Sequence, residues 1–239
     1  KYYEYIKEHG YSRHLYEFKD EYANMPVDVQ KDEKKGLYYV QKEKKRLYFR
    51  KSTPAKKIQK YYRALSMEQD RRSPHHYFNS VKEVTGKVFV DVGCAEGYSS
   101  LEIIEEAKHV YLFEQDEQWL EAIRATFEPW QDKVTIVQKY VNDHNSSREQ
   151  TLDDFFNNQT NEHLFLKMDI EGAERHALAG CNNLFQNCQK LDFAICTYHL
   201  RDDEEVISAF LDKHNCTYIN QKGFFRHKIR SVVMRGSKK

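Results

Sequence analysis

From residue 87 onward, short runs of apolar residues alternate with segments in which apolar residues recur every three or four positions. The runs predict buried strands, and the longer spacing predicts amphipathic helices. Strands are expected at residues 87–92, 110–113, 134–137, 164–168 and 191–196. Helices are expected around Leu101, Ile104 and Ala107, around Trp119, Leu120, Ile123 and Phe127, and over residues 204–214. This alternation requires right-handed crossovers and predicts an α/β, Rossmann-like fold with a mostly parallel sheet and helices on both faces.

The first 80 residues have a different pattern and predict an N-terminal extension to a main domain at residues 81–239. The first 30 residues are rich in tyrosine and mixed in charge, which predicts helices or a segment wrapped over the domain. Residues 36–41 and 46–50 predict a basic hairpin with a charged turn, and a Ser-Thr-Pro sequence at residue 52 begins a helix. The extension is expected to act as a substrate lid or as the contact of a homodimer.

Two further elements are expected at either end of the main domain. Ser73-Pro74 predicts a short helix that leads into it. Residues 216–221 and 229–234 predict two late strands around a loop at Gly223.

Composition changes this picture little. The 239 residues are 40% hydrophobic and 31% charged, and no stretch approaches the roughly 20 apolar residues of a membrane helix. No charged and then apolar leader is seen at the start, which is Lys1 rather than Met. The cysteines form no C-x-x-C pair, which predicts reduced thiols in a cytoplasmic protein.

The charge is unevenly distributed. Between Lys31 and Arg63, ten Lys and three Arg face three acidic residues, a net of +10. Since the whole chain carries +1, the remainder carries −9. The basic segment is interpreted either as a solvated surface or as a surface that steers an anionic partner.

Polar residues gather where the predicted strands end, which is where such sheets bind ligands. After the first strand, Gly93 and Gly97 permit a tight turn into a helix with free N–H groups, although a turn alone also needs glycine. Glu114 ends the second strand, 17 positions after Gly97, where a carboxylate can accept both ribose hydroxyls. The loop has G-x-x-x-G spacing, and its acidic Asp91 and Glu96 suit an ammonium and a sulfonium better than a pyrophosphate.

The third and fourth strand ends carry the candidate catalytic groups. Lys167 and Asp169 share one face of a strand, as an ion pair or as functional residues. The fifth strand ends in Tyr198 and His199 beside the Asp169 strand, so His199 is the candidate general base, with a structural histidine as the alternative. Asp169 or Glu171 would orient His199 or bind the reacting molecule. The Tyr198 ring would make a cation–π contact with a bound sulfonium.

These residues carry a resemblance to the FkbM-type methyltransferases over about residues 87–235. The matching motifs are Phe89-Val90-Asp91-Val92-Gly93 with Gly97, Glu114, Thr151-Leu152-Asp153, and Leu166-Lys167-Met168-Asp169-Ile170-Glu171-Gly172-Ala173-Glu174 with Gly180. The resemblance implies a seven-stranded sheet with an antiparallel last strand, S-adenosylmethionine as donor, and O-methylation. It also implies that the Gly93–Gly97 loop holds the methionine portion, Glu114 the ribose, and Val141 with its neighbours the adenine. Cys94 and Glu96 depart from the family's more common Ala-Asn-x-Gly loop.

The sequence therefore predicts an S-adenosylmethionine-dependent O-methyltransferase that acts on a hydroxyl of a sugar, glycan or related natural product, including an anionic one, and releases S-adenosylhomocysteine. The expected catalytic residues are His199, Asp169 and Glu171, without a metal. The expected cofactor-binding residues are Asp91, Gly93, Cys94, Ala95, Gly97, Tyr98, Ser99, Glu114, Gln115, Val141 and Asp169.

Three alternatives to a metal-free O-methyltransferase are compatible with the sequence. A divalent ion on Asp169, Glu171 and His199 would acidify the acceptor hydroxyl. An NAD(P)-dependent reductase would use the same carboxylate for ribose. A non-catalytic module would bind an anionic glycan or nucleic acid through the basic hairpin. Methylation of nucleic acid is disfavoured, because the sequence has no Asn/Asp-Pro-Pro-Tyr motif.

Overall fold

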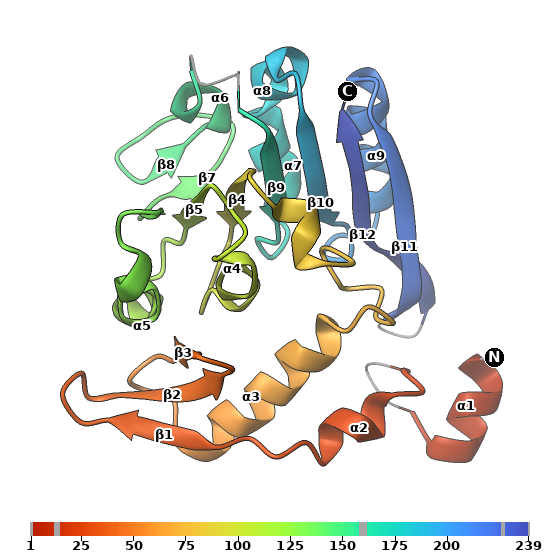
Figure 1. Ribbon diagram of the computed structural model, residues 1–239. Coiled ribbons are helices and arrows are strands. Elements are labelled where there is room, and N and C mark those ends of the chain that lie inside the picture. The colour runs from red at the N-terminus through yellow and green to blue at the C-terminus, as the bar shows by residue number, and fades with distance from the viewer. Residues whose placement is uncertain (1, 12–14, 158–161, 226–227, 239) are drawn as a thin grey trace.

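The computed structural model describes residues 2–11, 15–157, 162–225 and 228–238. Its centre is a seven-stranded sheet in the order β11-β12-β10-β9-β4-β5-β6 (Figure 1). All paired neighbours are parallel except β12, which runs antiparallel to both β10 and β11. The strands are β4 (Val88–Val92), β5 (His109–Phe113), β6 (Val134–Val137), β9 (Leu164–Met168), β10 (Leu191–Cys196), β11 (Thr217–Phe225) and β12 (Lys228–Lys238). The predicted fold class and the antiparallel last strand are confirmed.

The central strands are buried on both faces, which explains their continuous apolar runs. In β4, Phe89 packs into one core, whereas Val88 and Val90 pack into the other. The first core is covered by α4 (Tyr98–Ile103) and α5 (Glu117–Phe127). The second is covered by α6 (Leu152–Phe155), α7 (Glu174–Ala179), α8 (Asn182–Asn187) and α9 (Asp203–Lys213). A small pair of strands, β7 (Tyr140–Val141) and β8 (Glu149–Gln150), lies beside α6.

The N-terminal extension packs on the side of α4 and α5 (Figure 1). It consists of α1 (Tyr2–His9), α2 (Lys19–Ala23), a sheet of β1 (Val29–Asp32), β2 (Leu37–Lys42) and β3 (Lys45–Tyr48), and α3 (Ala55–Glu68). The predicted hairpin and helix are present, and β1 adds a third strand. Leu47 and Ile58 are fully buried in the same core as Leu101 of α4, so the extension and the main domain share one hydrophobic core.

The basic segment is partly neutralised by this docking. Lys35 pairs with Glu128 at 2.8 Å, Lys42 with Glu102 at 3.4 Å and Arg50 with Asp116 at 3.3 Å. Each pair joins the extension to α4 or to residues that flank α5. Part of the positive charge at residues 31–63 therefore complements the acidic main domain of the same chain.

Two local predictions are wrong. Ser73-Pro74 forms a turn instead of a helix, and the short helix near it is the 3-10 turn η1 (Val81–Val84). Gly223 lies inside β11, paired with Arg230, and not in a loop. A Cβ at Gly223 would lie 2.3 Å from the Pro74 ring, so the proline covers the strand where glycine leaves room. Residues 226–227, between β11 and β12, lie outside the described residues, as do residues 1 and 12–14 of the extension.

Two broader expectations concern membrane-spanning helices and cysteines. The described part of the chain contains no helix that is both long and apolar enough to cross a membrane. All five cysteines are free thiols, as expected of reduced residues. The cytoplasmic location and the homodimer stay predictions.

Candidate active site

A cavity of about 600 Å³ lies where β4, β5 and β9 end. The loop after β4, Glu114 after β5 and Asp169 after β9 form its floor, and Val141 of β7 lies to one side. Its remaining wall comes from the N-terminal extension, through Arg50, Tyr61, Leu65, Glu68, Gln69 and Tyr77. The volume is in the range of ordinary small-molecule sites.

The loop after β4 depends on glycine for close packing. Gly93 has φ +78°, and a Cβ there would lie 2.1 Å from the carbonyl oxygen of Asp169. Gly97 has φ +81°, and a Cβ there would lie 2.7 Å from the Phe127 ring. The amides of Gly93 and Cys94 both donate to the Phe113 carbonyl, at 3.0 and 3.2 Å. The loop is therefore fixed between the ends of β5 and β9.

A buried ion pair lies directly under this loop. Lys167 Nζ is 2.8 Å from Asp91 Oδ1 and donates to the Gly93 carbonyl at 2.7 Å. Ser100 Oγ donates to the other Asp91 oxygen at 2.6 Å. Burial alone would lower the pKa of Lys167, but the carboxylates of Asp91 and Asp169 outweigh it and raise that pKa. Of the two alternatives for Lys167 and Asp169, the ion pair is therefore not the one formed, because Lys167 pairs with Asp91 on the neighbouring strand instead.

Two carboxylates face the cavity from the loops after β4 and β5. Glu114 accepts the amide hydrogens of Ala95 at 3.0 Å and Asp116 at 2.8 Å, and burial raises its pKa. Glu96 is only 3% exposed and accepts a 2.8 Å hydrogen bond from the Tyr61 hydroxyl. Burial raises the pKa of Glu96 to about 7, since water no longer solvates its charge.

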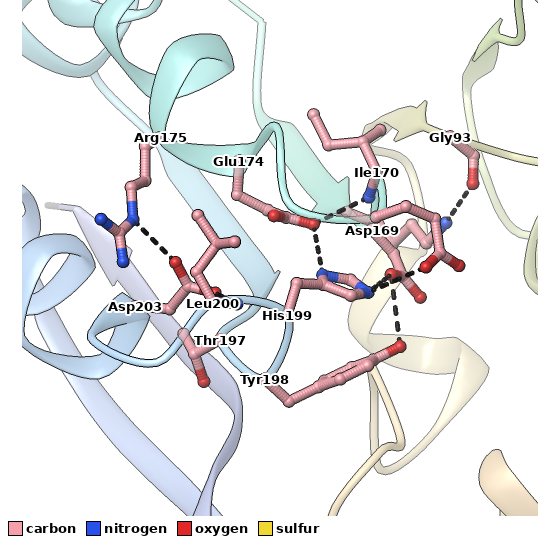
Figure 2. A network of polar contacts seen from close by, with 12 residues as sticks. Gly93, Asp169, Ile170, Glu174, Arg175, Thr197, Tyr198, His199, Leu200 and Asp203 are labelled. Atoms are coloured by element: carbon pink, nitrogen blue, oxygen red, sulfur yellow. Dashed lines mark hydrogen bonds and ion pairs between the residues drawn. The ribbon is translucent and has the colours of Figure 1, made fainter.

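Asp169 lies at the centre of a polar network at the other end of the cavity (Figure 2). The Tyr77 hydroxyl donates to its Oδ2 at 2.7 Å, and the Tyr198 hydroxyl donates to its Oδ1 at 3.4 Å. Burial would raise the pKa of Asp169, but Lys167 and His199 hold it below its ordinary value. The side chain is therefore ionised near neutral pH.

The His199 ring lies between carboxylates on both sides (Figure 2). Its Nδ1 is 2.8 Å from Glu174 Oε1, which also accepts the Ile170 amide hydrogen at 2.9 Å. Its Nε2 is 3.5 Å from Asp169 and 3.6 Å from Glu171. Burial would lower the pKa of His199, but these carboxylates, Glu174 above all, raise it.

Comparison with known proteins identifies this part of the chain. Residues 141–219 match the family model of the methyltransferase FkbM domain. Over these residues the chain is similar to FkbM methyltransferases. The predicted resemblance is therefore confirmed.

Solved structures of methyltransferases are also similar to this chain. Methyltransferase FkbM from Methylobacillus flagellatus KT has 19% identity and a TM-score of 0.52, over 63% of this chain and 43% of that one. This chain thus spans less than half the length of that protein. Magnesium protoporphyrin IX methyltransferase (ChlM) from Synechocystis PCC 6803, solved with bound SAM, has 12% identity and a TM-score of 0.49, over 79% and 86% of the two chains. No curated protein matches the sequence.

Most of the site residues predicted from the sequence line this cavity. They are Asp91, Gly93, Cys94, Ala95, Tyr98, Ser99, Glu114, Gln115, Val141, Asp169 and Glu171. Gly97 and His199 do not line it. Gly97 shapes the turn and packs on Phe127, and His199 lies behind Asp169. What each residue binds, including His199 as a base, stays a prediction.

The sequence predicted that the extension acts as a substrate lid or a dimer contact, but it identified none of the residues that the extension contributes to the cavity. Tyr61 of α3 stacks on Trp119 of α5, with ring centroids 6.4 Å apart, and Arg50 lies 4.2 Å from the Trp119 ring centroid. Tyr77 reaches Asp169 from the segment between α3 and η1. The high tyrosine content of the extension was the one available signal, and it did not indicate which tyrosines point inward.

Proposed function

We propose that this chain transfers a methyl group from S-adenosylmethionine to a hydroxyl oxygen of a sugar, glycan or related natural product. The observation that carries this proposal is one continuous cavity that joins the glycine loop and Glu114 to Asp169. The cavity joins groups suited to the methyl donor with groups suited to the methyl acceptor. It lies at the carboxyl edge of the sheet, where doubly wound folds bind ligands.

The residues present fit the donor in charge and polarity. Glu114, Val141 and Phe113 line the cavity, where Glu114 would accept ribose hydroxyls and the other two would contact adenine. Glu96 supplies a carboxylate for the α-ammonium group. When bound, S-adenosylmethionine supplies an electrophilic sulfonium methyl. A carboxylate in this loop would repel the pyrophosphate of NAD(P), which argues against a reductase.

The acceptor side favours a neutral polyhydroxylated molecule. Tyr77, Tyr198 and Gln69 offer hydroxyl and amide groups, and Glu68, Asp169 and Glu171 offer carboxylates. These carboxylates would repel an anionic acceptor, and part of the basic segment is neutralised within the chain. The hydroxyl must lose its proton during transfer, and the cluster of Asp169, Glu171 and His199 is the group proposed to promote that loss.

The proposal is tested with the purified full chain in two steps. Isothermal titration should show micromolar affinity for S-adenosylmethionine and S-adenosylhomocysteine. Labelled donor is then offered with neutral glycans and with their phosphorylated counterparts, and label should appear on the neutral ones. Absence of binding to either donor ligand would refute the proposal as a whole.

A further inference from the structure

Two buried side chains beside the proposed acceptor end carry polar atoms that have no aligned hydrogen bond among the described residues. His199 is 7% exposed, and neither of its ring nitrogens has an aligned hydrogen bond. Glu174 is fully buried, and its Oε2 likewise has none. An unsatisfied buried polar group costs on the order of 1–3 kcal/mol, so such atoms usually bind a water molecule or an ion.

The carboxylates around His199 lie at distances suited to a shared metal ion. His199 Nε2 lies 3.5 Å from Asp169 Oδ1 and 3.6 Å from Glu171 Oε2. Neighbouring and opposite ligands of an octahedral ion are about 3.0 Å and about 4.2 Å apart, because each metal–oxygen bond is about 2.1 Å long. We propose that His199 Nε2, Asp169 and Glu171 bind one divalent metal ion, and that Glu174 orients the His199 ring from behind.

The division of roles follows from what each carboxylate contacts. Glu174 Oε1 already accepts the Ile170 amide hydrogen and lies 2.8 Å from His199 Nδ1. A carboxylate on one ring nitrogen commonly fixes the tautomer that leaves the other nitrogen to a metal. Nε2 is directed towards Asp169 and Glu171, which both line the cavity. The open coordination positions of the ion would therefore face the acceptor.

The local charge also favours a cation. Three carboxylates surround one imidazole, and the nearby Lys167 is already paired with Asp91. Glu171 is 92% exposed at its side chain, so it can move by the small distance that coordination needs. One imidazole with two carboxylates suits Mn²⁺, which accepts both nitrogen and oxygen ligands, and Mg²⁺ to a lesser degree.

This inference deepens the proposed function, on which its catalytic use rests. An ion at this position would lie beside the acceptor hydroxyl and lower its pKa. Metal binding itself does not depend on the donor and can be measured without it.

The test is a titration of the full chain with Mn²⁺, in which the electron paramagnetic resonance signal of the free ion measures how much has bound. One Mn²⁺ should bind per chain. His199→Ala and Asp169→Asn should weaken binding at least tenfold, and Glu174→Gln should weaken it roughly 10- to 100-fold. The Glu171 side chain lies at the surface, so Glu171→Gln should leave the fold intact. It should also weaken Mn²⁺ binding. His176→Ala, at a side chain that is 67% exposed, is the matched control and should change nothing.

Each other result has a defined meaning. Failure to bind Mn²⁺ in a chain that binds S-adenosylhomocysteine normally would overturn the inference and leave the proposed function standing. Equal Mn²⁺ affinity in wild type and Glu171→Gln or His199→Ala would place the ion elsewhere and also overturn it. Retained Mn²⁺ binding without donor binding would reject the proposed function and not the metal site.

Discussion

The Tyr61 hydroxyl of α3 donates a 2.8 Å hydrogen bond to the Glu96 carboxylate in the loop after β4. This contact joins the N-terminal extension to the glycine loop that we propose binds the methyl donor. It also stabilises the ionised form of Glu96 against a burial effect that raises its pKa to about 7. The extension therefore takes part in setting the charge that a donor ligand would meet.

Donor affinity should accordingly depend on pH. If the ionised Glu96 binds the α-ammonium group, affinity for S-adenosylhomocysteine should rise about tenfold between pH 6 and pH 8, because the ionised fraction rises by that factor around a pKa of about 7. Titration calorimetry across this range measures it. Glu96→Gln should bind weakly with a flat profile, and Tyr61→Phe should move the rise to higher pH. A flat wild-type profile would exclude this role for Glu96.

The same raised pKa makes a prediction about stability. The folded-state pKa of Glu96 lies above its ordinary value of 4.5, so the folded protein binds this proton more tightly than the unfolded chain. The contribution of Glu96 to the free energy of unfolding should be greatest below pH 4.5 and should be lost as pH rises to about 7. Urea unfolding at pH 5 and pH 8 should show Glu96→Gln gaining stability relative to wild type at the higher pH. An equal difference at both pH values would contradict it.

Glu114→Ala should weaken S-adenosylhomocysteine binding by roughly 10- to 100-fold, the range for a lost charged hydrogen bond. The variant removes the expected ribose contact and releases the Ala95 and Asp116 amides. Glu117→Ala, an exposed carboxylate at the start of α5, is the matched control. Unchanged affinity in Glu114→Ala would show that the ribose binds elsewhere.

His199→Ala should lower turnover by about 10²–10⁴ while donor affinity stays nearly constant. Both the general-base prediction and the metal site require the imidazole near the acceptor. Asp169→Asn should impair turnover and donor affinity together, because Asp169 also lines the cavity and bonds to Tyr77. Single-turnover rates and calorimetry separate the two effects. Near-full turnover in His199→Ala would remove His199 from the chemistry.

Lys167→Met should destabilise the fold by about 3–5 kcal/mol, because it leaves the buried Asp91 without its partner. The double variant Lys167→Met/Asp91→Asn should recover part of that loss in urea unfolding. Lys108→Met breaks the exposed pair with Glu162 and should change stability by about 1 kcal/mol or less. Similar losses for the two lysines would mean that the buried pair has no special weight.

The sequence by itself determined the sheet and the edge at which a ligand would bind. β4 and β9 are buried on both faces, so their apolar runs could be recognised locally. Parallel strands end at the same edge, and this alone brought Gly93, Glu114 and Asp169 together.

Only the tertiary structure decided which groups are partners. Lys167 pairs with Asp91 on the next strand, Tyr61 reaches Glu96 from 35 positions away, and Pro74 covers Gly223. Periodicity along the chain encodes which side chains are buried, because burial follows from the face of a strand or helix. It does not encode which distant element packs against that face, and the partner of a buried charge is set by that packing.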